Sequence, residues 1–388
     1  MKKHFILKVL VLFISFSILS LWFNPTSIFR KKTNTIVLND RPINISSIED
    51  SSSYVKIDST NSFNIDKPVD TSFWINNDEI ILATMYSYKD LNSDVDVLNT
   101  KTNSSAKLDI KNLSSDFLVS PLGNGFLYGS REEYVNKVIN GFNPEVYKKM
   151  YGYPTKYYYY SLLDNASTPI PEGLKPIKWL PDGSGFIANP YTSNSLVIYD
   201  IESKTTHTFL DKSSGIDTAE ISSETSQIVI SNDGSTYYFS CYDYKLGMYS
   251  IYKMSKKDMT PEKILSDIYI SPKIELINNN LLVLTNTDEN SIFIYDTEKH
   301  KKLKTITPSS KSFNINISND KSMLALFENV YLAKLSVFNL NDPNLTATEI
   351  FRSKNSISNI SWSNDNKLSF QVTDGYNGNN VIYTYSFK

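Results

Sequence analysis

Apolar and polar positions alternate in a repeated order along the chain from about residue 65 onward. Each copy begins with an aromatic or aliphatic residue, continues through a turn rich in Asn and Asp, and ends in a short apolar run. Residues 74–83, 179–188 and 362–370 show the order clearly. A second recurring unit is an apolar run that stops on Asp or Asn, as in 196–200 and 292–296. Short runs bounded by turn residues predict strands, so the pattern predicts an all-β chain.

The repeat spacing predicts the architecture. Anchors at the ends of the predicted first strands lie roughly 40 to 60 residues apart, and a four-stranded propeller blade takes ~40–50 residues. The sequence therefore predicts a β-propeller over residues 51–388, with seven blades and with six or eight as the alternatives. The seven anchors are Trp74, Val119, Trp179, Ile221, Leu276, Ile317 and Trp362.

Two segments depart from the simple repeat. An insertion at about 131–155 has apolar residues on one helical face, which predicts a small helical insertion in the second blade. The last repeat supplies only three strands, at about 357–362, 367–373 and 380–387. Residues 53–58 alternate apolar with polar side chains, and we expect them to complete the last blade as its outer strand, because closure removes an open sheet edge.

The N-terminal segment reads as a membrane anchor. Lys2, Lys3 and His4 precede an apolar run over 5–23, which is long enough to cross a bilayer core of ~30 Å. No small-x-small cleavage site follows it, so residues 1–23 are expected to be an uncleaved signal anchor or transmembrane helix. Residues 24–50 then form an extracytoplasmic tether. This predicts a single-pass protein of a bacterial cell membrane with its propeller on the extracytoplasmic side, or a secreted protein if the leader is cleaved.

Charge and cysteine content narrow the functional classes. The formal net charge is −2, from 39 basic and 41 acidic residues, which gives no electrostatic case for nucleic acid. The single cysteine, Cys241, excludes an internal disulfide framework.

The turns at 179–188 and 362–370 resemble those of TolB-like propellers and of the propeller domains of prolyl-oligopeptidase-type proteases, a WD40-like repeat superfamily. In that superfamily a Trp-Ser-Pro-Asp-Gly turn joins the first two strands of each blade. Residues 179–183 keep Trp, Pro, Asp and Gly, whereas 362–366 have Asn in place of Pro. The resemblance implies the fold and says little about function.

Residues for catalysis are scarce. Nucleophilic hydrolysis usually needs a His beside the nucleophile, yet His207 and His300 fall on the outer-strand side of their repeats. Asp94 and Asp96 share one strand face, and 288–290 form an acidic loop; both are interpreted as solvated strand ends. We therefore assign no catalytic residue, no metal ligand and no cofactor.

Tyrosines mark one predicted face of the propeller. Loops from the second to the third strand of each blade open on the same face as the blade-to-blade connections, and all but the fifth of these loops contain Tyr. A Tyr side chain offers an apolar ring and a polar tip, which suits binding surfaces; packing between blades is the alternative. The candidate ligand-binding or partner-binding residues are Tyr86, Tyr88, Tyr134, Tyr151, Tyr153, Tyr191, Tyr242, Tyr244, Tyr331 and Tyr376.

These features predict a non-catalytic, membrane-anchored propeller that binds a protein partner or a cell-envelope glycan through its loop face. The alternative is a polysaccharide hydrolase or lyase that uses carboxylates in the central channel. A third reading is a structural role in a membrane complex through the insertion at 131–155. Clustered carboxylates at the channel mouth would favour the enzyme, and exposed aromatic side chains would favour the binding protein.

Overall fold

The structure is a computed structural model, and it describes residues 55–388 except 85–93, 111–112, 131–155, 191–194, 217–227, 244–245, 269–271, 330 and 374–379. The chain divides into a unit over residues 1–40 and a unit over 41–388, and all the described residues belong to the second. The predicted anchor at 1–23, the tether at 24–50 and the insertion at 131–155 lie outside the described residues. Within the described part of the chain, no helix is long and apolar enough to cross a membrane.

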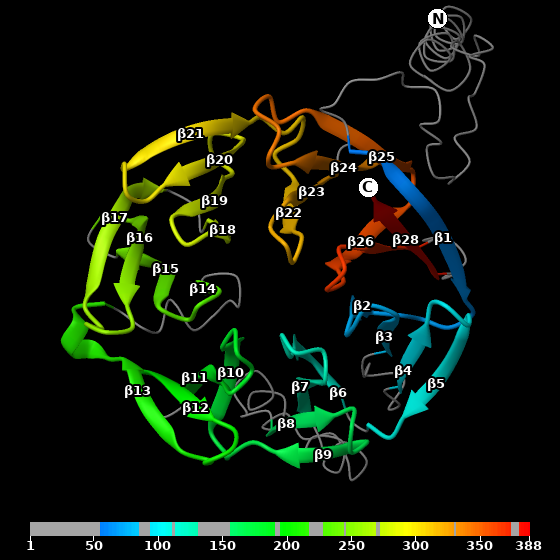
Figure 1. Cartoon of the computed structure of the whole chain (residues 1–388), viewed down its shortest axis with the longest axis horizontal. Helices are drawn as coiled ribbons and strands as arrows, with labels where there is room; N and C mark the ends of the chain where they lie inside the picture. Colours follow the sequence, from blue (N-terminus) through cyan, green and yellow to red (C-terminus); the bar gives the residue numbers. More distant parts are fainter. Residues whose placement is uncertain are drawn as a thin grey trace, which may run out of the picture. The chain divides into compact units, whose positions relative to one another are not determined.

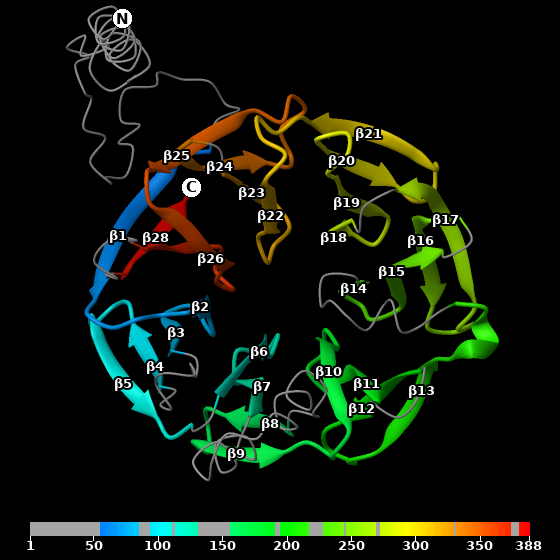
Figure 2. The ribbon, with the colours of Figure 1, turned by 180° about the vertical axis from the view of Figure 1, so that it is seen from behind.

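Seven antiparallel sheets of four strands each are arranged in a ring (Figures 1 and 2), so the predicted seven-bladed β-propeller is confirmed. The first blade contains β2 (Thr71–Trp74), β3 (Glu79–Thr84), β4 (Asp94–Asn99) and β5 (Ser104–Leu108). The second contains β6 (Leu113–Val119), β7 (Gly125–Ser130), β8 (Lys156–Ser161) and β9 (Ala166–Pro169). The third contains β10 (Leu174–Trp179), β11 (Gly185–Pro190), β12 (Leu196–Asp200) and β13 (Thr206–Leu210), followed by a short 3₁₀ turn (Lys212–Ser214).

The remaining blades follow in the same order. The fourth contains β14 (Ile228–Ile230), β15 (Thr236–Asp243), β16 (Met248–Ser255) and β17 (Pro261–Ile268). The fifth contains β18 (Ile274–Asn278), β19 (Leu281–Asn286), β20 (Ser291–Asp296) and β21 (Lys301–Ile306). The sixth contains β22 (Phe313–Ile317), β23 (Met323–Asn329), β24 (Ala333–Asn339) and β25 (Ala347–Ser353), and the seventh contains β26 (Ser356–Trp362), β27 (Leu368–Thr373), β28 (Asn380–Phe387) and β1 (Ile57–Ile65).

One predicted anchor was wrong. The inner strand of the fourth blade is β14, which ends at Ile230, whereas the sequence analysis placed the anchor at Ile221. The physical reason is the turn at 231–234, which joins β14 to β15 and therefore marks the end of the inner strand. All three residues of β14 are buried, as expected for a strand packed between neighbouring blades.

The ring closes by pairing the first strand with the last. β1 is antiparallel to β28, with Phe63 opposite Ile382 and Ile57 opposite Phe387. The predicted outer strand of the last blade is thereby confirmed, although it spans 57–65 and not 53–58. Just before it, the Val55 N–H donates to Thr348 Oγ1 of the sixth blade at 3.2 Å.

Tryptophans at the ends of inner strands tie neighbouring blades together. Trp74, Trp179 and Trp362 are only 4%, 7% and 6% exposed, as predicted for blade core. Trp179 Nε1 donates to the carbonyl of Leu118 in the preceding blade at 2.9 Å, and Trp362 Nε1 donates to the carbonyl of Asn316 at 3.2 Å. Trp179 and Trp362 therefore bury their rings between two sheets and satisfy their indole donors across the seam.

The turns between first and second strands share one geometry in five blades. The residue at the fourth turn position donates its N–H to the carbonyl of the first, and its own φ is positive. The fourth position holds Gly123, Gly183, Gly234, Lys321 and Asn366 in blades two, three, four, six and seven. In blades four, six and seven the first residue is Ser, whose hydroxyl donates to the Asp two positions later. The repeated Ser-Asn-Asp pattern thus reflects a turn that satisfies its own polar groups.

Ring closure predicts a large cost for truncating Phe63. This side chain is 6% exposed and packs with Trp74, Ile80 and Ile382. We expect Phe63→Ala in the full-length protein to lower the free energy of unfolding by about 3–5 kcal/mol. Asn61→Ala, on the exposed part of the same strand, serves as the control and should stay within about 0.5 kcal/mol of wild type in urea denaturation. A loss for Phe63→Ala that is as small as the loss for Asn61→Ala would show that β1 contributes little to the free energy of unfolding.

The Ser-Asn-Asp turn predicts a pH dependence. Hydrogen bonds from the Ser231 hydroxyl and from Ser235 lower the pKa of Asp233 to about 2. Its stabilising effect is therefore complete above the ordinary carboxyl pKa of about 3.9 and is lost as the pH falls towards 2. Asp233→Asn should lower Tm at pH 7, and the difference from wild type should shrink between pH 4 and pH 2. Asp288→Asn, in an exposed turn, should match wild type; a difference for Asp233→Asn that persists at pH 2 would contradict the assignment.

Candidate functional site

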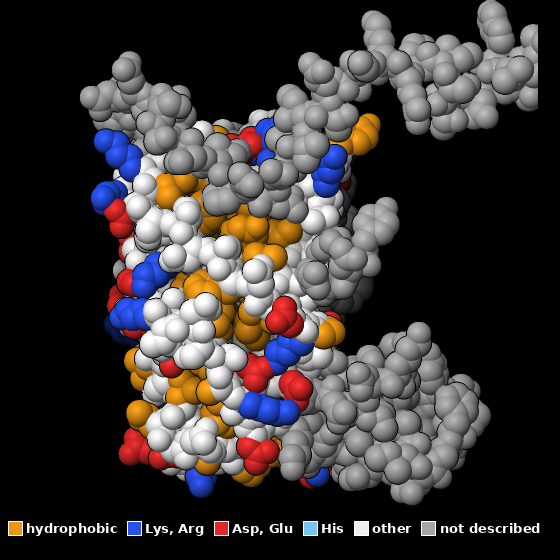
Figure 3. Space-filling model, turned by 90° about the vertical axis from the view of Figure 1, so that its right-hand side faces the viewer, with side chains coloured by type: hydrophobic (Ala, Val, Ile, Leu, Met, Phe, Trp, Pro, Cys, Tyr) orange, Lys and Arg blue, Asp and Glu red, His pale blue; other side chains and the backbone are white. Residues whose placement is uncertain are grey.

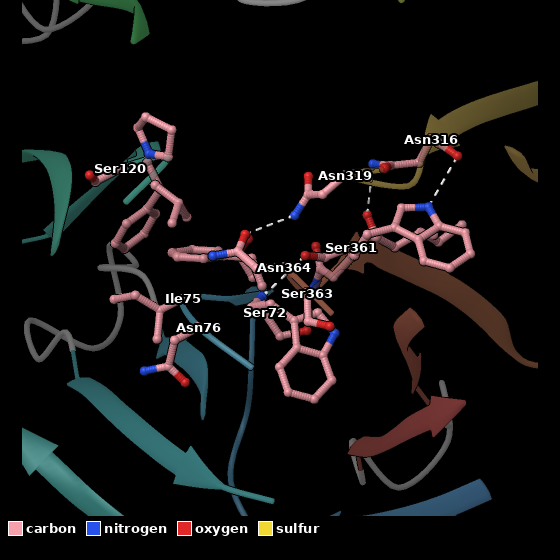
Figure 4. Close-up of a pocket in the computed structure, with 18 residues that line it drawn as sticks. Ser72, Ile75, Asn76, Ser120, Asn316, Asn319, Ser361, Ser363 and Asn364 are labelled. Atoms are coloured by element: carbon pink, nitrogen blue, oxygen red, sulfur yellow. Dashed lines mark hydrogen bonds between the residues drawn. The ribbon is translucent and has the colours of Figure 1, made fainter. Parts of the chain in front are cut away.

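A cavity of about 450 Å³ opens where the inner strands of blades one, two, six and seven end (Figure 4). Its walls come from β2, β6, β22 and β26 and from the turns that follow these strands. The turns bring together residues separated by almost 290 positions, because the first and seventh blades are neighbours in the closed ring; Trp74 N–H donates to Ser361 Oγ at 3.1 Å.

The described lining of this cavity has no charged side chain. None of the described residues that line it is Asp, Glu, His, Cys, Lys or Arg. Aromatic rings of Phe73 and Phe117, with centroids 5.0 Å apart, cover the side towards blade two. The polar lining side chains are Thr71, Ser72, Asn76, Ser120, Asn316, Asn319, Asn359, Ser361, Ser363 and Asn364.

Hydrogen bonds hold the polar rim in place. Asn319 Nδ2 donates to Asn364 Oδ1 at 3.0 Å, across the seam between blades six and seven (Figure 4). Asn316 Nδ2 donates to the carbonyl of Ile360 at 3.1 Å. Both Asn319 and Asn364 are exposed, so their carboxamides are accessible to a molecule in the cavity.

Trp74 departs from the pattern of the other anchor tryptophans. Among the described residues, its buried Nε1 has no hydrogen-bond partner, whereas Trp179 and Trp362 donate to the preceding blade. The neighbouring inner strand is β26 of the seventh blade. Its pairing with β27 has an irregular register between Ser358 and Ser361, and Asn359 has a φ of 52°. This bulge lies beside the cavity, since Asn359, Ile360 and Ser361 are among its lining residues.

A second cavity of about 320 Å³ adjoins the first. Val119, Pro121 and Asn319 line both of them. The second cavity extends towards blades three, four and five and contains three charged side chains, Lys178, Glu275 and Lys321. The end of the channel therefore has a neutral part and a charged part.

The cavities lie at the opposite end of the blades from Tyr242 and Tyr331, the two tyrosine candidates that the structure describes. The cavities lie at the turns that join first to second strands, whereas second strands such as β15 run away from those turns. Tyr242 lies near the far end of β15, is partly buried and has its ring centroid 5.1 Å from that of Tyr249. Tyr331 is 99% exposed. The other eight candidates lie outside the described residues, so the predicted tyrosine face stays a prediction: Tyr86, Tyr88, Tyr134, Tyr151, Tyr153, Tyr191, Tyr244 and Tyr376.

The sequence analysis missed the cavity residues because Asn and Ser are ordinary turn residues. The available signal was their presence inside inner strands, which in a propeller are packed on both faces. Asn314 and Asn316 alternate with Ile in β22, and Asn359 and Ser361 flank Ile360 in β26. Polar residues at alternate positions of an inner strand indicate a hydrated channel wall.

The other titratable residues named from the sequence lie on the protein surface or in ion pairs. His207 is exposed on the outer strand β13, and His300 is exposed in the turn before β21. Asp94 pairs with Lys107 at 2.5 Å and Asp96 pairs with Lys67. In the described part of the chain, no group of three or more His, Cys, Asp and Glu side chains is arranged to hold a metal ion.

The outer wall also shows no single-sign charge. Figure 3 looks at the side of the ring where β1 and β5 lie, and Lys, Arg, Asp and Glu side chains are scattered there among neutral and hydrophobic ones. That wall has no continuous basic band of the kind that contacts a phosphate backbone.

Comparison with solved structures places this fold among known propellers. The β-propeller domain of the Trilobed protease from Pyrococcus furiosus is 12% identical, with a TM-score of 0.56 over 84% of this chain and 97% of that one. Oligogalacturonate lyase from Vibrio parahaemolyticus is 13% identical, with a TM-score of 0.55 over 87% and 98%. The Swd1 propeller domain from Myceliophteria thermophila is 13% identical, with a TM-score of 0.53 over 85% and 99%.

A prolyl endopeptidase is 12% identical, with a TM-score of 0.53 over 79% of this chain and 46% of that one, so the predicted resemblance to prolyl-oligopeptidase-type propellers holds for the fold. TolB from Acinetobacter baumannii is 11% identical, with a TM-score of 0.46 over 79% of each chain. No protein-family model and no curated protein matches the chain. At these identities the similarity concerns architecture and does not transfer an activity.

The cavity rim predicts a specific cost for adding a side chain at Gly123. A Cβ at this residue would lie 2.9 Å from the carbonyl oxygen of Ile75 in the first blade. Gly234 has a similar positive φ but open space around it. We expect Gly234→Ala to cost about 1–2 kcal/mol in unfolding free energy from backbone strain alone, and Gly123→Ala to cost more. Equal costs in chemical denaturation would show that the contact between blades one and two is loose.

Proposed function

We propose that this chain is a non-catalytic binding protein that holds a protein partner at the end of the channel where the turns after the inner strands meet. The observation that carries the proposal is the neutral cavity lined by Asn, Ser and aromatic side chains. Glycoside hydrolysis and most acyl transfer require positioned acids and bases, and the described lining of this cavity supplies none. A carboxylate-based hydrolase or lyase therefore has no specific support at this site.

Carboxamides and hydroxyls suit uncharged polar ligands. An Asn side chain offers both donors and an acceptor, which matches a peptide backbone, and the exposed Asn319 and Asn364 are fixed by their mutual hydrogen bond. Pre-positioned groups lose little conformational entropy when a ligand binds.

Exposed apolar residues at the same end of the propeller as the cavity favour a protein partner over a glycan. Leu122, in the turn after β6, is 59% exposed, and Leu163, in the turn between β8 and β9, is 85% exposed. These turns lie at the same end of the second blade, where the Leu162 N–H donates to the carbonyl of Asn124 at 3.0 Å. Aliphatic side chains of this kind form the centres of protein interfaces.

The proposal includes the setting predicted from the sequence. The basic start and the apolar run over 5–23 support a membrane anchor that holds the propeller on the extracytoplasmic side. The partner would then be another protein of the cell envelope.

The test is crosslinking of the full-length protein in intact cells, with mass spectrometry of what is captured. Asn319→Trp places a bulky ring at the boundary of both cavities and should reduce capture by ~10-fold or more, as expected when a binding pocket is blocked. Asn341→Trp is the matched control, because Asn341 is exposed in the outer turn of the same blade. It should capture like wild type.

Asn319→Trp both removes the hydrogen bond to Asn364 and fills the cavity. Asn319→Ala separates these two effects, because it removes the hydrogen bond without filling the cavity. An intermediate loss is expected from it. Undiminished capture by Asn319→Trp, with unchanged Tm, would show that the partner binds elsewhere on the chain.

A further inference from the structure

The charged part of the channel end has an excess of positive charge. Lys178 on β10 and Lys321 in the turn after β22 line the smaller cavity together with Glu275 on β18. A third lysine, Lys273, precedes β18 and has its Nζ 3.6 Å from a Glu275 carboxylate oxygen. This end of the channel thus has three lysines and one carboxylate, and only Lys273 is paired with that carboxylate.

The three lysines differ in how they are held. Lys273 Nζ also donates to the carbonyl of Ile315 and, at 3.3 Å, to Asn314 Oδ1, so its position is fixed by β22. In the part of the chain that the structure describes, no carboxylate oxygen lies within 4 Å of Lys178 Nζ or of Lys321 Nζ. Burial lowers the pKa of Lys178, Glu275 opposes this effect, and Lys321 and Lys273 lower the pKa further. An anion placed among these groups would relieve the repulsion.

Lys321 differs from the residues at the equivalent position of the other turns. It occupies the left-handed position of its turn, at a φ of 66°, where three other blades have Gly and one has Asn. A residue with a side chain pays about 1 kcal/mol or more for this backbone conformation. The turn places Lys321 in the lining of the smaller cavity.

The remaining walls of the cavity are apolar and define the ligand further. Trp179, Val229 and Leu276 line it beside the lysines. A ligand that fits therefore combines an anionic head with an aliphatic stem, so that the stem covers the apolar wall. A glutamate or aspartate side chain has this form, whereas a bare phosphate would leave the wall uncovered.

We propose that the smaller cavity receives an acidic side chain, a glutamate or an aspartate, presented by a protein partner, with Lys178 and Lys321 as the groups that bind its carboxylate. This inference deepens the proposed function and rests on it: the neutral cavity holds the neighbouring uncharged part of the same partner segment. Val119, Pro121 and Asn319, which line both cavities, connect the two subsites.

The test uses a small probe and no partner. Full-length protein labelled with ¹³C-lysine is titrated with N-acetylglutamate N-methylamide and, separately, with the matching glutamine compound. The Lys178 ¹³Cε signal is assigned by its absence in Lys178→Met. We expect the glutamate probe to shift this signal to saturation and the glutamine probe to leave it unchanged.

Variants give a signature that a purely structural role would not produce. Lys178→Met should abolish binding of the glutamate probe, measured by the remaining lysine signals. Lys321→Gly should weaken it by ~10-fold, as expected for one charge-assisted hydrogen bond, while raising Tm because the strained turn relaxes. Lys301→Met, on the exposed start of the outer strand β21, is the control and should bind the probe like wild type.

Three results would overturn the inference: equal shifts with both probes, no shift with the glutamate probe, or tighter binding of inorganic phosphate than of the glutamate probe. The two proposals can fail independently. If the acidic subsite is wrong, the glutamate titration fails but partner capture still falls in Asn319→Trp. If the proposed partner site is wrong, capture is unchanged in Asn319→Trp but the glutamate probe still binds.

Discussion

The pairing of β1 with β28 is the constraint on which the rest of the propeller depends. A sheet ring with an open seam exposes unpaired backbone groups on the strands at the gap, and here the first described strand covers that edge over Ile57 to Ile65. The same pairing brings the first blade against the seventh, so that Trp74 N–H reaches Ser361 and Lys367 Nζ reaches the carbonyl of Asn77 at 2.8 Å. Without closure, the walls of the larger cavity would not meet, because they come from blades at both ends of the chain.

The inner strands then decide what faces the channel. Their apolar residues pack between blades, and the anchor tryptophans donate across the seams at Leu118 and Asn316. Polar residues of these strands and of the turns that follow them line the end of the channel, with Asn and Ser in the larger cavity and Lys and Glu in the smaller one. A neutral subsite and a charged subsite are therefore built from the same repeated strand, with different residues at equivalent places.

The turns after the inner strands position these subsites. A hydroxyl-to-carboxylate bond within the turn, as between Ser318 and Asp320 at 2.7 Å, fixes a tight backbone path whose fourth residue takes a positive φ. Where that residue is Gly123 or Gly183, the turn is relaxed and the preceding blade approaches closely. Where it is Lys321, the turn is strained and adds a charge to the channel. One turn geometry thus serves both close packing between blades and the placement of a charged side chain at the channel.

The sequence by itself determined the all-β class, a propeller of six to eight blades with seven preferred, the outer strand that closes the ring and the buried anchor tryptophans, because strand periodicity and turn chemistry are short-range properties. It misplaced the inner strand of the fourth blade, whose end is marked by the turn at 231–234. Only the tertiary structure decided which Asn, Ser and Lys residues share a cavity. Asn319, Asn364 and Lys178 look like ordinary turn or strand residues in the sequence, and they become neighbours only when the ring closes and the inner strands converge on one axis.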